Sequence, residues 1–313
     1  MNNKLSRNGS SQPPTAPLFV PRVEGRAWRG GSLEEHFFLT ILPSGFTSVD
    51  YNPDAPDIKE EPPPRTCALW LNSNYSSFEQ ATQLVQRLRP SIIFHCGDER
   101  GDREEWDQLY VSTVEYLRQY HHPGYRYSVS PFVHHLPLGY HREMWFASQR
   151  ACRPAFERKL LWSWFGSLRE DRLPMLDAFR KLAFPSIWGD GRTPAQVAEH
   201  YLDSRYVPVG PGMHSLDCYR IYEAAHCGAI PVVVGRSRQE VRHTFCKEGR
   251  GETDNLPPWL FADSWPEAVE KILELESDQQ QVERHRQRVL LWWHHRIYAL
   301  IQLLAPWAPR STR

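Results

Sequence analysis

Short apolar runs alternate with segments of helical spacing along most of this chain, and the whole alternation occurs twice. The first series starts at residues 67–71 and the second at residues 159–165. Parallel strands need a crossover between them, usually a helix, and these helices cover both faces of the sheet. The pattern therefore predicts two doubly wound α/β domains in series, with a ligand site in a cleft between them, outside the carboxyl ends of the strands.

The individual elements follow from the spacing of the apolar residues. In the first half we expect strands at 67–71, 91–95 and 132–136, helices at 77–88 and 107–120, and an edge strand at 36–42. In the second half we expect strands at 159–165, 205–209, 229–234 and 259–261, and helices at 169–183, 196–203, 215–226 and 265–275. A linker or crossing helix at 145–158 joins the halves.

These elements divide the chain into four parts. They are a polar, disordered lead at 1–32, an N-terminal domain at 33–150, a C-terminal domain at 151–280, and a tail at 281–313 whose helix packs back on the first domain. No apolar run approaches about 18 residues, so we expect no transmembrane helix. The lead also lacks the apolar centre of a signal peptide.

Charge and motif content exclude several classes of protein. The 37 Lys and Arg balance the 37 Asp and Glu, so no global field favours nucleic acid, although a local basic patch for a small anion is compatible. The chain has no HExxH, DxD, GxSxG, GxGxxG or CxxC motif, which argues against metal-dependent, hydrolase, dinucleotide and structural zinc chemistry. We expect the six cysteines to be free thiols. The oligomeric state is not readable.

One group of candidate residues follows the strand at 159–165. Gly166 permits a close approach of the backbone, and Ser167 is placed to cap the next helix, whose free amides suit a phosphate. Arg169 and Arg172 would add charge-assisted hydrogen bonds. The alternative is that both arginines are solvated and paired with the neighbouring carboxylates.

A second group surrounds the helix at 215–226, which a Gly/Pro turn containing Gly212 precedes. Ser215 and the first helix amides suit phosphate, and Arg220 would neutralise the charge of a diphosphate. Glu223 would accept hydrogen bonds from ribose hydroxyls. Because Arg220 and Glu223 share a helix face, a structural ion pair between them is the alternative.

These residues carry a resemblance to a known family. The segment Ser215-xxxx-Arg220-xx-Glu223-Ala-xxx-Gly228-Ala-Ile-Pro-Val232 resembles the C-terminal signature of exostosin-like glycosyltransferases, and Phe165-Gly-Ser167 with Arg172 is similar to the start of their donor-binding domain. In the first half, Phe94-His-Cys-Gly-Asp-Glu99, Leu117-Arg-Gln-Tyr120 and Leu136-Pro-Leu-Gly-Tyr140 are similar to a subset related to ribitol-phosphate xylosyltransferases.

The resemblance implies a GT-B-like fold of two Rossmann-type domains and a glycosyltransferase of glycan biosynthesis or protein glycosylation. It implies transfer from a UDP-sugar to a glycan or other hydroxyl acceptor with inversion, a donor site without metal or other cofactor, and an acceptor site on the N-terminal domain. A chain that follows the eukaryotic members would be associated with the Golgi or another secretory membrane, and otherwise it would be cytoplasmic. The donor-binding residues would be Gly166, Ser167, Arg172, Gly212, Ser215, Arg220 and Glu223.

An inverting transfer also needs a base beside the acceptor hydroxyl. Asp98 and Glu99 follow the strand at 91–95, and either can serve as that base; alternatively they cap the next element or pair with nearby arginines. With Arg220 they make up the predicted catalytic set. His95 and Arg118 are assigned to the acceptor side, where Arg118 would orient one of these carboxylates or bind the acceptor; the alternative is that Arg118 is a surface residue.

Two other functions remain open. A fold of this kind can persist in a non-catalytic module that binds a sugar nucleotide or a glycan. The spacing of Arg220 and Glu223 can also be accidental in an unrelated α/β protein. The sugar and the acceptor are not readable, because their contacts fall on loops such as 188–193 and 236–255.

Overall fold

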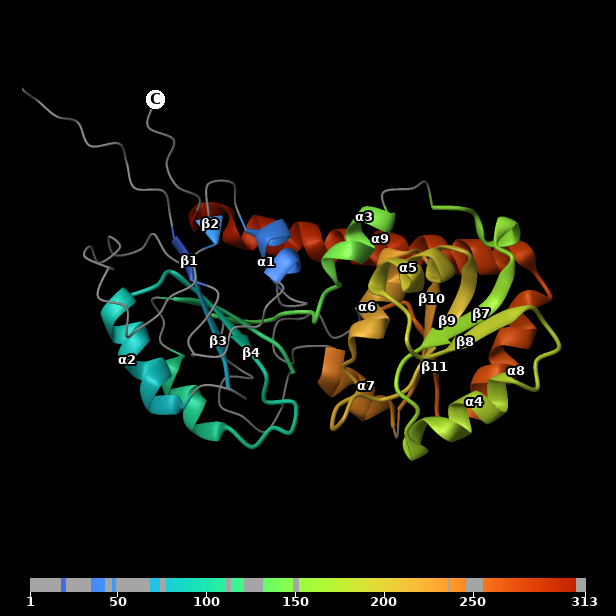
Figure 1. Cartoon of the computed structure of the whole chain (residues 1–313), viewed down its shortest axis with the longest axis horizontal. Coiled ribbons are helices and arrows are strands. Elements are labelled where there is room, and N and C mark those ends of the chain that lie inside the picture. Colours follow the sequence, from blue (N-terminus) through green and yellow to red (C-terminus); the bar gives the residue numbers. More distant parts are fainter. Residues whose placement is uncertain are drawn as a thin grey trace, which may run out of the picture.

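The computed structural model of the 313-residue chain describes residues 18–20, 35–42, 47–48, 68–73, 77–110, 114–120, 132–148, 152–235, 237–245 and 256–307. These residues form two lobes, each built on one parallel sheet, and a long helix runs along both (Figure 1). The predicted fold class, two Rossmann-type α/β domains in a GT-B-like arrangement, is confirmed by this architecture.

The first sheet has six strands in the order β2-β1-β3-β4-β5-β6, all parallel. They are β1 (Leu18–Val20), β2 (Thr47–Ser48), β3 (Ala68–Asn72), β4 (Ile92–Cys96), β5 (Glu115–Arg118) and β6 (Val133–His135). The strands predicted at 67–71, 91–95 and 132–136 are confirmed as β3, β4 and β6. Residues 1–32 were predicted to be a disordered lead, but residues 18–20 of that segment form β1. The other residues of the segment lie outside the described residues.

Two predictions for this domain are wrong. The helix predicted at 107–120 is a 3₁₀ turn, η1 (Glu104–Leu109), followed by β5. Strand β5 is buried on both faces, because Tyr116 packs into one side of the core and Leu117 into the other, so it shows no strand alternation. The edge strand predicted at 36–42 is instead the helix α1 (Glu35–Ile41), since a short apolar run does not distinguish the two.

The remaining helices before the second sheet are short. They are α2 (Phe78–Leu88), α3 (Arg142–Ser148) and the 3₁₀ turn η3 (Ala155–Glu157). Helix α2 matches its prediction and begins at a capping box, in which Ser77 and Gln80 bond to each other's backbone amides. Helix α3 and η3 take the place of the predicted linker, and residues 149–151 between them lie outside the described residues.

The second sheet has five parallel strands in the order β11-β10-β9-β7-β8. They are β7 (Leu160–Phe165), β8 (Ser186–Gly189), β9 (Ser204–Val209), β10 (Ile230–Val234) and β11 (Leu260–Ala262). Its helices are α4 (Leu173–Phe179), α5 (Pro194–Leu202), α6 (Tyr219–His226), α7 (Arg238–Phe245) and α8 (Trp265–Glu276). Strand β8 and helix α7 were not predicted, and the other elements lie within a few residues of their predicted bounds.

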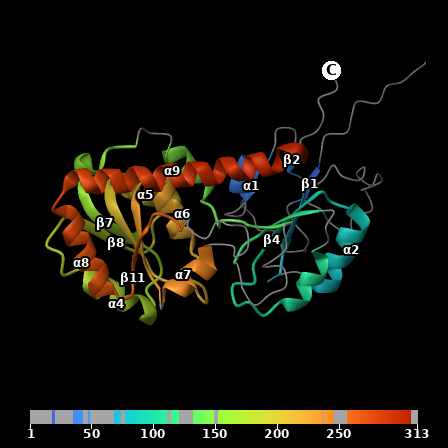
Figure 2. The same cartoon turned by 180° about the vertical axis from the view of Figure 1, so that it is seen from behind.

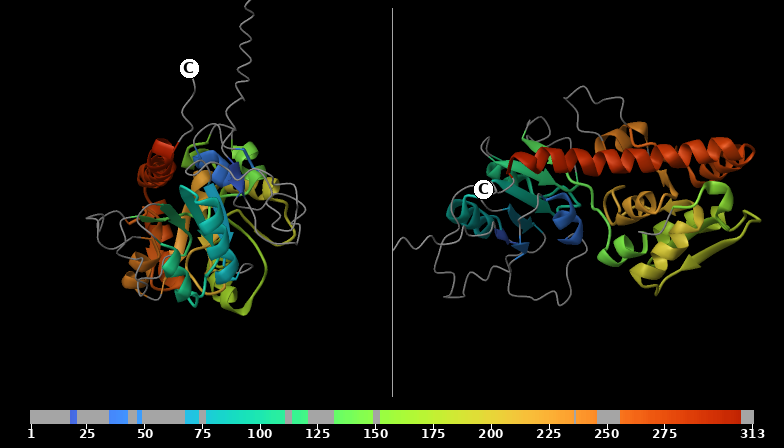
Figure 3. Two further views of the ribbon diagram at one scale, coloured as in Figure 1. Left: turned by 90° about the vertical axis from the view of Figure 1, so that its left-hand side faces the viewer. Right: turned by 90° about the horizontal axis from the view of Figure 1, so that it is seen from above.

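Helix α9 (Gln279–Leu304) crosses both lobes and continues into the 3₁₀ turn η5 (Ala305–Trp307) (Figures 2 and 3). It begins where Asp278 accepts the amides of Gln280 and Gln281. It packs on α6, α8 and β10 of the second domain and on α1 of the first. Within the described part of the chain, no helix combines the length and the apolar character needed to cross a membrane.

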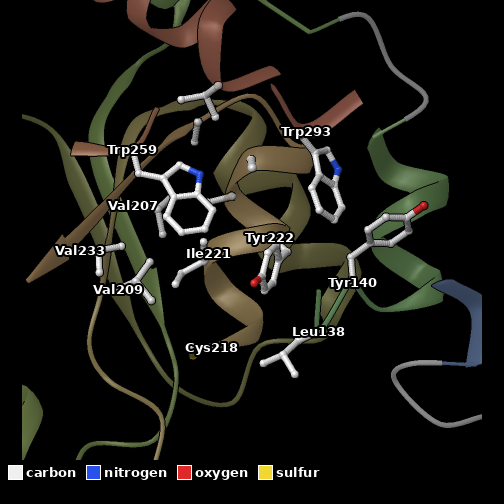
Figure 4. Close-up of a cluster of buried hydrophobic side chains, with 14 of the residues drawn as sticks. Leu138, Tyr140, Val207, Val209, Cys218, Ile221, Tyr222, Val233, Trp259 and Trp293 are labelled. Atoms are coloured by element: carbon white, nitrogen blue, oxygen red, sulfur yellow. The ribbon is translucent and has the colours of Figure 1, made fainter. Parts of the chain in front are cut away.

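An aromatic seam joins the two domains beneath α9. The fully buried Trp293 ring stacks on Phe37 of α1 at 5.8 Å and meets Tyr222 of α6 at 5.5 Å. Tyr140, which follows β6, stacks on His226 of α6 at 3.9 Å, and its ring lies edge-on beside Trp293 at 6.3 Å (Figure 4). The seam makes the hydrophobic cores of the two domains continuous. It therefore holds the first sheet in a fixed position relative to the second.

Replacing Trp293 by Ala should lower the free energy of unfolding by about 3–5 kcal/mol, the usual cost of removing a large buried ring. Tyr298→Ala on the same helix is the matched control, because that side chain is 62% exposed, and its effect should stay within about 0.5 kcal/mol. Chemical denaturation measures both values. Equal effects of the two changes would contradict the role given to the seam.

Candidate functional site

The strand order of the second sheet reverses between β7 and β9, because the chain passes from β7 outward to β8 and then returns to the other side of β7. Loops that leave neighbouring strands at such a point diverge and open a ligand crevice outside the carboxyl ends. The loop after β7 contains Gly166 and Arg172, and the loop after β9 contains Gly212 and Ser215. The fold thus brings both predicted groups to one edge of the sheet.

Two arginines from the first of these loops bind the backbone of the second. Arg169 donates to the carbonyl oxygens of Pro211 at 3.2 Å and Gly212 at 2.7 Å. Arg172 donates to the carbonyl of Pro211 at 3.2 Å and to that of Ser167 at 3.0 Å. Neither arginine is simply solvated, so the alternative raised from the sequence holds only for the ion pair of Arg169 with Asp171.

Arg220 reaches the same edge from helix α6. Its Nε donates to the carbonyl oxygen of Phe165, the last residue of β7. A methyl group on Gly166 would lie 2.5 Å from the Arg220 Nη2 atom, so position 166 must be a glycine for the guanidinium to lie there. The close approach predicted at Gly166 is therefore made by Arg220, a contact that was not predicted from the sequence.

The three guanidinium groups of Arg169, Arg172 and Arg220 form one cluster. Burial lowers the pKa of Arg172, and the positive charges of Arg220 and Arg169 lower it further. Of these three side chains, only Arg169 has an ion-pair partner among the described residues, whereas Arg172 and Arg220 are held by carbonyl oxygens. Burial lowers the pKa of Arg220, but the nearby Cys218, Tyr201 and Glu223 side chains outweigh that and raise it. Because unpaired buried charge costs folding free energy, this cluster is poised to bind an anion.

Glu223 lies one turn beyond Arg220 on α6. Burial raises the pKa of its carboxyl, and the positive charge of Arg220 opposes the shift. Within the described residues the carboxylate has no hydrogen-bond partner and no ion pair, so the structural Arg220–Glu223 pair suggested as an alternative is absent. The group remains available to accept hydrogen bonds from a ligand.

Neither serine caps a helix as the sequence predicted. Helix α4 begins only at Leu173, after the 3₁₀ turn η4 (Glu170–Arg172), so Ser167 contributes its carbonyl oxygen to Arg172. Helix α6 begins at Tyr219, and the Ser215 Oγ atom accepts the amide of Asp217 at 3.1 Å instead. The Ser215 side chain thus makes a local turn bond that competes with helix formation. Before α4, the Arg172 amide bonds to the Arg169 carbonyl in the 3₁₀ turn, and both helices start later than expected.

Three of the predicted first-domain residues are buried beneath the edge of their sheet. Arg118 forms an ion pair with Asp98 and donates to the His95 Nδ1 atom at 2.7 Å. Asp98 Oδ1 also accepts the amide of Asp102 at 2.9 Å. With exposed fractions of 1–2%, these side chains hold the loop after β4 in place, and Arg118 orients the Asp98 carboxylate, one of the roles predicted for it. Asp98 as a base and His95 and Arg118 as acceptor contacts stay predictions.

Glu99 behaves differently, because its side chain crosses to the second domain. The Oε1 atom accepts the backbone amides of His214 at 2.8 Å and Ser215 at 3.3 Å. The next residue, Arg100, donates from Nε to the His214 Nε2 atom at 3.0 Å. Of the two predicted base candidates, Glu99 therefore reaches the loop after β9 of the second domain.

A second interdomain contact was missed from the sequence. His135, the last residue of β6, places Nε2 3.4 Å from the buried Asp217 carboxylate, and Arg296 of α9 donates to the His135 carbonyl at 2.8 Å. His135 ends β6 and Asp217 lies in the loop after β9, so both lie on the carboxyl-end side of their sheets, where ligands of open α/β sheets bind. That rule is the only signal that points to them.

The cysteine prediction is confirmed where the chain is described, and the metal prediction is untested. Cys96, Cys152, Cys218 and Cys227 are free thiols, whereas Cys67 and Cys246 lie outside the described residues. Over the described ranges, no group of three or more His, Cys, Asp or Glu side chains is arranged to hold a metal ion.

A family model and a set of solved structures match this chain. Residues 196–303, from α5 to the end of α9, match the family model described as RXYLT1 C-terminal domain. This match supports the predicted likeness to ribitol xylosyltransferases, while the exostosin-like assignment stays a prediction. No curated protein sequence matches the chain.

Among solved structures, an alpha-glucosyltransferase in complex with UDP and DNA is similar at 12% identity and TM-score 0.45, over 86% of this chain and 84% of that one. Anabaena Alr3699/HepE in complex with UDP and glucose is similar at 10% identity and TM-score 0.44, over 92% and 98%. T4 phage BGT in complex with UDP and Mn²⁺ is similar at 10% identity and TM-score 0.43, over 93% of this chain and 97% of that one. Scores this low assign no function to the chain.

His95 provides a pH test of the buried network. Burial lowers the pKa of His95 well below its usual value, and the charge of Arg118 adds to the shift. Only the unfolded chain then takes up this proton, so stability falls as the pH drops below about 6.5. His95→Asn keeps a hydrogen-bond acceptor near the Nδ1 position but does not titrate. Between pH 7.5 and 5.5, the free energy of unfolding of this variant should therefore fall by about 1 kcal/mol less than that of the wild-type chain. An unchanged pH dependence of unfolding would contradict this network.

Proposed function

We propose that this chain is a glycosyltransferase that moves a sugar from a nucleotide-sugar donor, a UDP-sugar, to a hydroxyl group of a glycan or other acceptor with inversion. The observation that carries the proposal is the guanidinium cluster of Arg169, Arg172 and Arg220 at the switch point of the second sheet. A diphosphate supplies the negative charge that this cluster lacks. The match of residues 196–303 supports the same class, because it contains Arg220 and Glu223.

In the proposed reaction the acceptor hydroxyl attacks the anomeric carbon while the bond to the diphosphate breaks. Arg172 and Arg220 stabilise the negative charge that develops on the leaving UDP, which is where electrostatic catalysis contributes most. Glu223 accepts hydrogen bonds from the ribose hydroxyls. Glu99 takes up the proton of the acceptor hydroxyl, since Asp98 is committed to Arg118. Two guanidinium groups supply the positive charge, so we expect transfer to persist in the presence of a chelator.

One observation favours the alternative of a non-catalytic sugar-nucleotide-binding or glycan-binding module. Asp98 is buried in an ion pair, and the Glu99 carboxylate is bonded to loop amides, so neither is free to act as a base in this arrangement. Release of UDP over a panel of UDP-sugars, with and without acceptors, separates the two functions. Tight UDP binding without turnover on any pair would favour the module.

Arg220→Ala should weaken UDP binding about 10- to 100-fold and reduce sugar transfer at least as much, because it removes charge-assisted hydrogen bonds at the leaving group. Isothermal titration and a UDP-release assay measure the two effects. Arg284→Ala is the matched control, since it removes one positive charge near the start of α9, where the side chain is 61% exposed. Unaltered binding and turnover in Arg220→Ala would remove this donor-site assignment.

A further inference from the structure

The loop after β9 is held from two sides by charged side chains. Its carbonyl groups at Pro211 and Gly212 accept from Arg169 and Arg172, as described above. Its amide groups at His214 and Ser215 donate to Glu99 of the other domain. The loop therefore presents a pair of backbone amides, and an anionic oxygen already binds both of them.

Glu99 is presented to this loop by a rigid turn. Gly97 and Asp98, which precede it, have φ of 84° and 60°, in the left-handed region that glycine and aspartate adopt most readily. The ion pair of Asp98 with Arg118 fixes the turn from below. On the opposite side, a methyl group on Gly212 would lie 2.4 Å from the Glu99 Oε1 atom, so a glycine there admits the carboxylate.

Such a loop binds a carboxylate and a phosphate in the same way, because its backbone amides donate hydrogen bonds to an anionic oxygen of either group. The two amides lie in the loop that Arg169 and Arg172 bind, beside the cluster proposed to hold the donor diphosphate. They cannot serve both anions at once. The contact of Glu99 and the binding of a donor phosphate at these amides therefore exclude each other.

We propose that Glu99 is a gate residue of the donor site: its carboxylate occupies the His214 and Ser215 amides until the diphosphate of the donor displaces it. This inference rests on the proposed function. Displacement frees the Glu99 carboxylate beside the bound donor, where the transfer needs a base. It also removes one of the contacts that join the two domains.

The gate makes a prediction opposite in sign to that of an ordinary binding residue. Glu99→Ala should bind UDP about tenfold more tightly than the wild-type chain, because the diphosphate no longer competes with a charge-assisted contact. Glu104→Ala removes the same charge from an exposed position of the neighbouring turn and should change the affinity less than about twofold. Isothermal titration with UDP measures all three proteins. Equal or weaker binding by Glu99→Ala than by the wild-type chain would overturn the gate.

Hydrogen exchange of the His214 and Ser215 backbone amides gives a second test, because their protection depends on a direct hydrogen bond and not on long-range charge. The wild-type amides of His214 and Ser215 should exchange slowly with or without UDP, whereas in Glu99→Ala they should exchange fast alone and slowly with UDP. Equal protection in Glu99→Ala without UDP would overturn the gate. Failure of both proteins to bind UDP would remove the proposed function, whereas binding by both with no gain in Glu99→Ala removes only the gate.

Discussion

Three positively charged guanidinium groups lie together at the carboxyl ends of the second sheet's strands, and the rest of the structure depends on this arrangement. Two of them, on Arg172 and Arg220, are held by backbone carbonyl oxygens and have no carboxylate partner among the described residues. Carbonyl groups orient a guanidinium without neutralising it. The site thus keeps the positive charge that an anionic ligand needs, and the packing of the surrounding fold offsets the cost.

The fold serves this edge in two ways. The reversal of strand order beside β7 spreads its two loops apart, and the close approach at Gly166 lets Arg220 bridge from α6 to the end of β7. The aromatic seam around Trp293 and the long helix α9 then set the first domain against the same edge. As a result Glu99 arrives from a different sheet at the loop that the arginines bind, so the proposed donor site contains a contact between the two domains.

Sequence reasoning predicted what local pattern determines and missed what depends on distant contacts. Most strands and helices around Arg172 and Arg220 were predictable, because short buried strands alternate there with helices of clear period, although β8, α7 and the starts of α4 and α6 were not. Strand β5 was not, since Tyr116 and Leu117 are buried on opposite faces and imitate helical spacing. The roles of Asp98 and Glu99 were also not separable: they are neighbours in sequence, and only the turn at Asp98 and the position of the second domain make one buried and the other a bridge.

The central claim, that the arginine cluster binds the diphosphate of a nucleotide sugar, is tested most directly by comparing the affinities of the wild-type chain for uridine, UMP and UDP at two salt concentrations. The account predicts that affinity rises with each phosphate, by about tenfold or more from UMP to UDP, and that this gain shrinks as salt rises. Equal affinities for the three compounds, or no binding of UDP, would contradict it.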